Sequence, residues 1–144
     1  MRRLCLVLIF LTLTATLAQA RMMSIDGTKV HLRTGPGTKY RVVWELGRGF
    51  PLKVLSQKGN WIKVKDFEGD TGWVHKKFLD REPHLIVKKN RVNIRNGPGT
   101  RYRVVGKANY GVVFRTVEHK QGWVKVRHEN GLTGWVMRNL LWGW

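Results

Sequence analysis

The sequence repeats itself at a spacing of 62 residues. Residues 33–43, RTGPGTKYRVV, recur as RNGPGTRYRVV at residues 95–105. The match continues without a gap to TGWV, at residues 71–74 and again at 133–136. A register kept over about fifty positions indicates a duplicated unit, and two copies are too few for a solenoid with a continuous core. We therefore expect two self-contained domains, which meet at the polar, proline-containing residues 80–83.

The first 20 residues have the organisation of a secretory signal peptide. Two arginines precede an apolar run at residues 4–17, and the small-x-small pattern AQA follows at residues 18–20. The run is too short to span a membrane. The single cysteine, Cys5, lies before the run, so the mature chain would have no thiol for a disulfide or a metal. We expect a cleaved signal peptide at residues 1–20 and a secreted or periplasmic protein.

The charge of the chain points to anionic partners. The formal net charge is +18, and removal of the two leader arginines lowers it to +16. A strong charge of one sign informs about partners rather than about the fold. An exported cationic protein meets wall glycan carboxylates, teichoic-type phosphates and lipid head groups. Nucleic acid is electrostatically possible, but the leader argues against it.

Within each copy the hydrophobic pattern has a period of two. Short β-branched and aromatic runs occupy residues 30–33, 61–65 and 71–74, and Gly, Pro and Asn separate them. After the leader no stretch has a helical period, apart from a short 3₁₀ turn expected at 76–79 and at 138–141. Many short strands between close turn signals predict small all-β barrels.

The GPGT loop is predicted to be stiff. Pro36 presets the second position of a turn, and Gly37 can adopt the positive φ that a type II turn requires at the third position. Such a turn would hold Tyr40 and its cationic neighbours Lys39 and Arg41 in a fixed place beside the barrel.

The two copies resemble the bacterial SH3-type domain. The resemblance rests on VHLRTGPGTKYRVV and VNIRNGPGTRYRVV, on a Trp-x-Lys-Val strand in mid-domain and on the closing TGWV with a leucine. The first copy departs at His31, where the family usually has asparagine. The resemblance implies two five-stranded SH3-like barrels, at residues 21–82 and 83–144. It also implies an envelope-targeting or ligand-binding module, of a kind often attached to wall hydrolases.

The sequence gives no pattern for catalysis or metal binding. The five histidines show neither H-x-x-x-H nor H-E-x-x-H spacing. Asp66, Glu68 and Asp70 suggest a calcium site, but the corresponding positions of the second copy are not acidic. A solvated hairpin tip explains the three acids more simply. We therefore expect no enzymatic activity, no cofactor and no metal.

An outward aromatic face is the candidate binding site. Trp61 shares a strand face with Lys63, opposite the aliphatic side, and an outward tryptophan beside cations can stack on a sugar or peptide. The alternative is that the tryptophans cap the barrels, and for the two TGWV tryptophans capping is favoured. The arginines at positions 33 and 95 can instead have a structural role, bound to a loop carbonyl or to an acid. The candidate ligand-binding residues are Tyr40, Trp61, Lys63, Trp73, Tyr102, Trp123, Lys125 and Trp135.

The second copy carries a candidate polyanion patch. Residues 21–83 have 13 cations and 7 acids, a net charge of +6, whereas residues 84–144 have 12 cations and 2 acids, a net charge of +10. A run of charge is often only a solvated face, but few acids accompany this one. The patch residues are Lys88, Lys89, Arg91, Arg101, Arg103 and Lys107.

These features predict a non-catalytic protein that binds peptidoglycan or an anionic cell-surface polymer through paired barrels. The alternative is a protein–protein adaptor that grips peptide segments in the periplasm or outside the cell. The two hypotheses differ in salt dependence, because binding to a polyanion weakens steeply with salt and binding in a peptide groove weakens much less.

Overall fold

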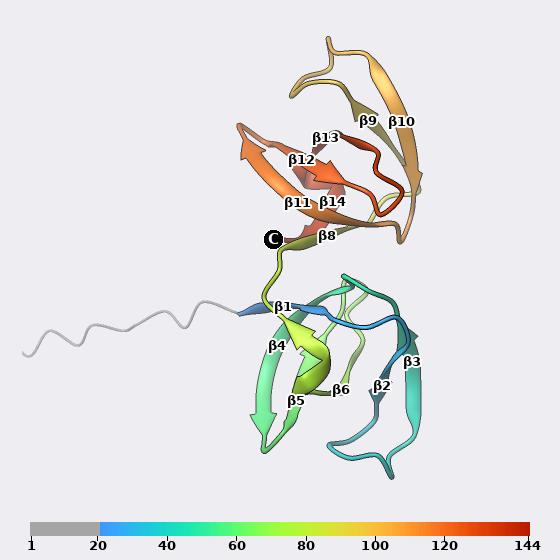
Figure 1. Ribbon diagram of the computed structural model, residues 1–144, viewed down its shortest axis with the longest axis vertical. Helices are drawn as coiled ribbons and strands as arrows, with labels where there is room; N and C mark the ends of the chain where they lie inside the picture. Colours follow the sequence, from blue (N-terminus) through green and yellow to red (C-terminus); the bar gives the residue numbers. More distant parts are fainter. Residues whose placement is uncertain (1–20) are drawn as a thin grey trace, which may run out of the picture.

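The computed structural model describes residues 21–144, and the expected signal peptide lies outside the described residues. The described chain forms two β-sheets (Figure 1). The first sheet contains β1 (Met22–Ile25), β2 (Val30–Arg33), β3 (Val42–Leu46), β4 (Pro51–Lys58), β5 (Trp61–Lys65), β6 (Thr71–His75) and β7 (Leu79–Asp80). The second contains β8 (His84–Val87), β9 (Arg91–Arg95), β10 (Val104–Asn109), β11 (Val113–Lys120), β12 (Trp123–Arg127), β13 (Thr133–Met137) and β14 (Leu141–Gly143). Two 3₁₀ helices, η1 (Lys76–Phe78) and η2 (Arg138–Leu140), complete the elements.

The two sheets have the same topology. The strand orders are β3-β2-β6-β5-β4-β1-β7 and β10-β9-β13-β12-β11-β8-β14, and every pairing is antiparallel. The prediction of two small SH3-like all-β barrels is confirmed. Each sheet has seven strands rather than five, because the segments at the start and end of each unit also pair with each other. Across residues 21–144 no helix is long and apolar enough to cross a membrane.

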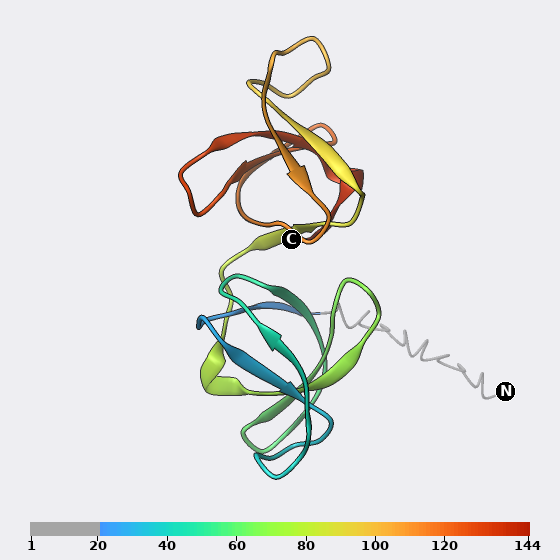
Figure 2. The same ribbon diagram turned by 90° about the vertical axis from the view of Figure 1, so that its right-hand side faces the viewer.

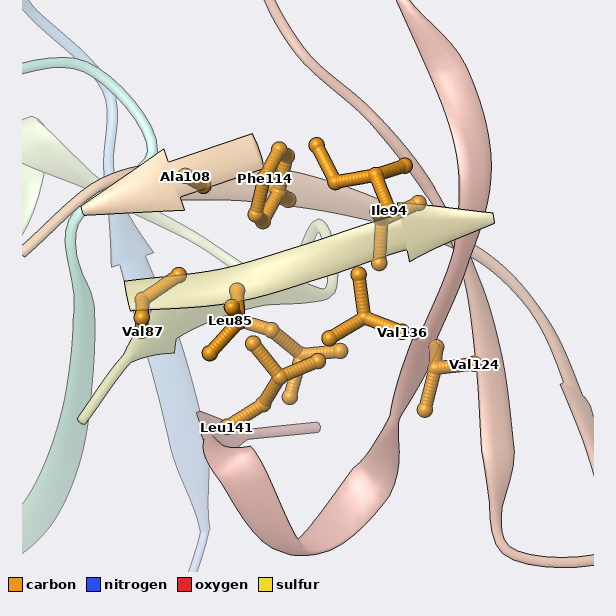
Figure 3. Packing of buried hydrophobic residues seen from close by; sticks show 10 residues of the cluster. Leu85, Val87, Ile94, Ala108, Phe114, Val124, Val136 and Leu141 are labelled. Carbon is orange, nitrogen blue, oxygen red and sulfur yellow. The ribbon is translucent and has the colours of Figure 1, made fainter. Parts of the chain in front are cut away.

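Each barrel has its own small core. In β5 the side chains of Ile62 and Val64 are buried while their neighbours in sequence are not, as the period of two requires. In the second barrel Phe114 is the largest fully buried side chain, and it packs with aliphatic residues from several strands (Figure 3). Burial of these apolar side chains is the main favourable term in folding. Domains of about sixty residues bury little surface, so each barrel is only marginally stable alone.

A short joint between β7 and β8 connects the two barrels (Figures 1 and 2). Polar side-chain contacts link the barrels there. The buried Ser24 hydroxyl donates to the carbonyl oxygen of Glu82 at 2.8 Å and lies 3.0 Å from Nδ1 of His84. The Glu82 carboxylate in turn accepts from Nε of Arg115 in the second barrel at 2.7 Å. A side chain on Gly49 would overlap the His84 ring. These contacts connect the two barrels at the joint.

The prediction of a type II turn in the GPGT loop is wrong. Gly37 does not have a positive φ. Its amide donates instead to the carbonyl oxygen of Gly35 at 2.9 Å, which makes a three-residue turn around Pro36. The ring of Tyr40 lies against Gly35 so closely that a Cβ there would overlap the ring. The glycine is needed because a tyrosine packs on the backbone, and the second copy repeats the arrangement.

In each copy an arginine side chain donates hydrogen bonds to the carbonyl oxygens of the GPGT loop. Nη1 of Arg33 donates to the carbonyl oxygens of Thr38 and Tyr40, at 3.0 Å each. Arg95 makes the equivalent bonds in the second copy at 3.1 and 3.0 Å. One cationic donor thus satisfies two loop carbonyls that no strand partner reaches, and this favours the structural role for both arginines.

We predict that Gly35→Ala destabilises the first barrel by about 1–3 kcal/mol, because the new methyl group overlaps the Tyr40 ring and the loop must deform. Unfolding of the mature chain in denaturant measures the change. Gly47→Ala is the matched control, since Gly47 has no positive φ and no heavy atom within 4 Å of an added Cβ. Equal stability of the two variants would contradict the proposed packing.

Candidate ligand-binding site

Three neighbouring strands of the first barrel present an aromatic and cationic outer face. Across β5 and β6, Trp61 lies opposite His75, and Lys63 lies opposite Trp73. Trp73 is in turn opposite Arg33 of β2. Directly opposed residues in a sheet project from the same face. The pairing therefore gathers residues that are far apart in the sequence onto one surface.

A cleft of about 350 Å³ opens at one end of this face. Its aromatic part consists of Trp61, His75 and Phe78, with ring centroids 5.2 Å apart for Trp61 and His75 and 6.3 Å apart for His75 and Phe78, both edge to face. Lys29 and Lys77 line it, the latter with Nζ 5.0 Å from the centre of the Phe78 ring. The cleft combines flat apolar surface with positive charge.

Among residues 21–144, those that line the cleft include three cations, Lys29, Arg33 and Lys77, and no acid. His31 also lines it, with Nε2 3.6 Å from the Glu45 carboxylate. Because Arg33 is occupied by loop carbonyls, the two lysines are the cations most available to a ligand. A carboxylate or phosphate is the natural partner for such a group of charges.

The candidate residues of the first copy occupy different places. Trp61 and Lys63 are half-buried on the outer face, as is Trp73. Tyr40 is 38% exposed, but its ring packs on its own loop, and Thr38 rather than Tyr40 lines the cleft. Tyr40 and Trp61, both candidate ligand-binding residues, therefore do not form two walls of this cleft.

The second copy has the same strands on this face but different side chains at some of the matched positions. Trp123 and Lys125 are half-buried on β12, and Trp135 is only 8% exposed, so it is closer to a core residue. Tyr102 packs on its loop as Tyr40 does. The position of His75 is taken by Met137, which removes an aromatic ring from beside the tryptophan.

The six cations of the expected patch are all exposed, and they come from several elements. Two lie in the turn before β9, and two lie in the loop between β9 and β10. Arg91 and Lys107 lie on the outer face of β9 and β10, where Arg91 is opposite Asn109 and Lys107 is opposite Asn93. A single patch made of all six remains a prediction. The six are Lys88, Lys89, Arg91, Arg101, Arg103 and Lys107.

The acidic hairpin is not merely a solvated tip, which corrects the sequence-based interpretation. Asp66 is only 5% exposed, and its Oδ1 accepts from the backbone amides of Glu68 and Asp70, at 2.9 Å each. The side chain therefore shapes the turn. His128 replaces it in the second copy, where Nδ1 accepts from the amide of Asn130 at 3.2 Å. Within the described part of the chain no cluster of His, Cys, Asp and Glu is arranged to hold a metal ion.

Sequence reasoning missed most of the cleft lining. His31 and His75 lack a metal or catalytic motif, and no sequence pattern points to Phe78. The period of two contains a usable signal for His75, since it lies two residues beyond Trp73 and so projects from the same face. No such signal exists for Phe78, because it lies in η1 and its position depends on where the 3₁₀ helix packs.

Comparison with known proteins establishes the family. The family model described as the bacterial SH3 domain matches residues 26–80 and 88–143. The chain belongs to this family.

Three similar proteins are each longer than this chain. A putative N-acetylmuramoyl-L-alanine amidase of Bacillus subtilis, YrvJ, is 26% identical over 139 residues, which are 89% of this chain and 27% of the relative. The uncharacterized protein YgiM of Escherichia coli K12 is 36% identical over 62 residues, 42% of this chain and 30% of the relative. The crystal structure of an NlpC/P60 family protein from Bacillus cereus matches with 17% identity and a TM-score of 0.39, covering 85% of this chain and 56% of that chain. The chain thus spans about a quarter of the Bacillus subtilis relative.

Burial raises the pKa of Asp66 above its ordinary value, although the amides of Asp70 and Glu68 oppose the change. Folding therefore disfavours the ionised carboxylate. The stability linked to this group is complete below the ordinary pKa and is lost as the pH rises through the raised value. We predict that Asp66→Asn, which keeps an acceptor oxygen but no charge, gains stability relative to the natural chain between about pH 3 and pH 7.

Unfolding in denaturant at the two pH values measures this difference. Asp66→Ala is the control, because it removes both the charge and the acceptor, and it should be less stable than Asp66→Asn by about 1–3 kcal/mol at both pH values. If the free energy of unfolding of the natural chain instead rises relative to that of Asp66→Asn as the pH rises, the ionised carboxylate stabilises the turn and the prediction is wrong.

Proposed function

We propose that the protein is a non-catalytic envelope-binding module, exported after cleavage of residues 1–20, which binds peptidoglycan or another anionic surface polymer. The observation that carries this proposal is the cleft of the first barrel, where Trp61 and Phe78 lie beside Lys29 and Lys77. An aromatic ring can stack on the apolar face of a sugar, and an ammonium group binds a carboxylate. Peptidoglycan carries both features in one repeating unit.

The comparisons support the same class of target. The chain belongs to the bacterial SH3 domain family, and one relative is named as a putative N-acetylmuramoyl-L-alanine amidase, an activity directed at the wall. The similarity covers only 27% of that relative, so it supports a shared binding module rather than a shared enzymatic activity. The high net charge adds a long-range attraction to an anionic polymer.

Tandem barrels suit a polymeric ligand. The GPGT loops, at residues 33–41 and 95–103, lie at opposite ends of the long axis (Figures 1 and 2). The outer face of one barrel is therefore separated along the long axis from the outer face of the other. We propose that each barrel binds weakly and that a polymer long enough to reach both faces is held more tightly through effective concentration.

We predict that Trp61→Ala weakens binding of the mature protein to purified wall sacculi by about 1–3 kcal/mol, a scale borrowed from aromatic stacking on nucleic-acid bases. Lys77→Gln should weaken binding less, and its effect should shrink as salt rises, because it removes an exposed charge. A co-sedimentation assay with a thermal melt on each variant makes the measurement. Leu55→Ala is the matched control, an exposed strand residue outside the cleft.

Two outcomes would contradict the proposal. If Trp61→Ala stays folded and binds sacculi as the natural chain does, the cleft is not the binding site. If the pure protein releases soluble fragments from sacculi, the chain is an enzyme. Binding that survives high salt unchanged would favour the peptide-adaptor alternative over an anionic polymer.

A further inference from the structure

A second cleft, of about 240 Å³, lies between the two barrels and has a different character. Its aromatic lining comes from both domains. Phe67 lies between Phe50 and Tyr110, with ring centroids 6.0 and 5.2 Å away. Trp44 lines the cleft as well and is 52% exposed, and Tyr110 is 48% exposed. Two large aromatic side chains are thus about half exposed between the two barrels.

The charge of this cleft is opposite to that of the molecule. Three of the nine acids in the chain, Glu45, Asp66 and Glu68, line it, and none of its lining residues within 21–144 is cationic. Loss of hydration raises the pKa of the Tyr110 hydroxyl, and the negative charge of the Glu68 carboxylate raises it further. Aromatic faces beside carboxylates attract cations through the ring quadrupole and through direct charge.

The second barrel contains the equivalent cleft, of about 170 Å³, with the chemistry reversed. At the positions of the three acids it has Lys107, His128 and Asn130. The aromatic residues are lost too, since Gly106, Val112 and Glu129 correspond to Trp44, Phe50 and Phe67. The fold requires neither the acids nor the rings at these positions, because the second barrel forms without them. Asp66 shapes its turn and Phe67 packs between Phe50 and Tyr110, but these roles do not require Trp44, Glu45 or Glu68.

An exposed strand edge lies beside the cleft. Trp44 and Glu45 belong to β3, the terminal strand in the hydrogen-bonded order of its sheet. A terminal strand offers backbone donors and acceptors along its free side, and an extended peptide can pair with them. The free edge of β3 can pair with an extended peptide, and the aromatic and acidic lining attracts a cation on that peptide.

We propose that the inter-barrel cleft binds a peptide segment that presents a lysine-type primary ammonium group. The ammonium lies among Trp44, Phe67 and Tyr110, with Glu45 and Glu68 as counter-charges, and the peptide backbone runs along β3. This inference goes beyond the envelope-binding proposal, because it concerns a separate site with the opposite preference for charge.

The test uses the full mature protein and a short probe, the tripeptide Ala-Lys-Ala with both ends blocked. Backbone amide NMR should show saturable shifts at residues 44–46, 66–68 and 110–111 when the probe is added. The same tripeptide with an acetylated lysine side chain has no charge and should produce much smaller shifts. Raising the salt concentration should weaken binding, since part of the attraction is between exposed charges.

Variants separate the two parts of the site. Trp44→Ala should raise the dissociation constant of the probe about two- to fivefold, the range expected for an exposed cation–π contact. Glu68→Gln should raise it as well, with a smaller salt dependence. Lys107→Gln is the matched control, because it lies in the equivalent cleft of the second barrel and should leave binding unchanged. Trp61→Ala should also leave it unchanged, which distinguishes this site from the wall-binding cleft.

Several results would overturn the proposal. Equal binding of the acetylated probe would identify an apolar docking groove rather than an ammonium site. Shifts spread over all exposed acids would indicate only non-specific attraction. Shifts at the same residues that depend on protein concentration, without probe, would show that a second copy of this chain covers the cleft. No shift at all at millimolar probe would exclude the site.

Discussion

The alternation of side chains across β5 is the constraint on which the first barrel and its candidate site both depend. Ile62 and Val64 are fully buried, so Trp61 and Lys63 must project outward. The same strand therefore supplies part of the core and part of the binding face. Antiparallel pairing with β6 then adds His75 opposite the tryptophan. A slip of one residue in register would exchange the two sets and destroy both the core and the face.

The two barrels show how far one fold tolerates a change of chemistry. The core positions stay apolar in both copies, because each barrel has little stability beyond what its core provides. The exposed positions have diverged. The first copy combines a cationic aromatic cleft with an acidic aromatic one, and the second has Met137 and Lys107 at corresponding places. The repeat therefore duplicates a scaffold rather than a site.

Some of the candidate site was predictable from local pattern and some was not. The outward placement of Trp61 followed from the period of two, and the same rule extended by one step would have found His75. The type II turn expected for the loop is not the one that forms. Tyr40 packs on Gly35 and Arg33 binds two loop carbonyls, and turn statistics do not contain these contacts. The sequence pattern of Asp66 is that of a solvated acid, because its role depends on hydrogen bonds that its carboxylate accepts from two backbone amides.

The sequence by itself determined the duplication, the positions of β2, β5 and β6 with their repeats, and the all-β class, because these depend on local periodicity and on turn residues. Only the tertiary structure decided which side chains from distant strands form a cleft. The inter-barrel cleft is the clearest case, since Phe67 and Tyr110 are 43 positions apart in the sequence and their rings lie 5.2 Å apart. Their contact depends on how the joint at Ser24, Glu82 and His84 orients two separate domains. No periodicity within either domain contains that information.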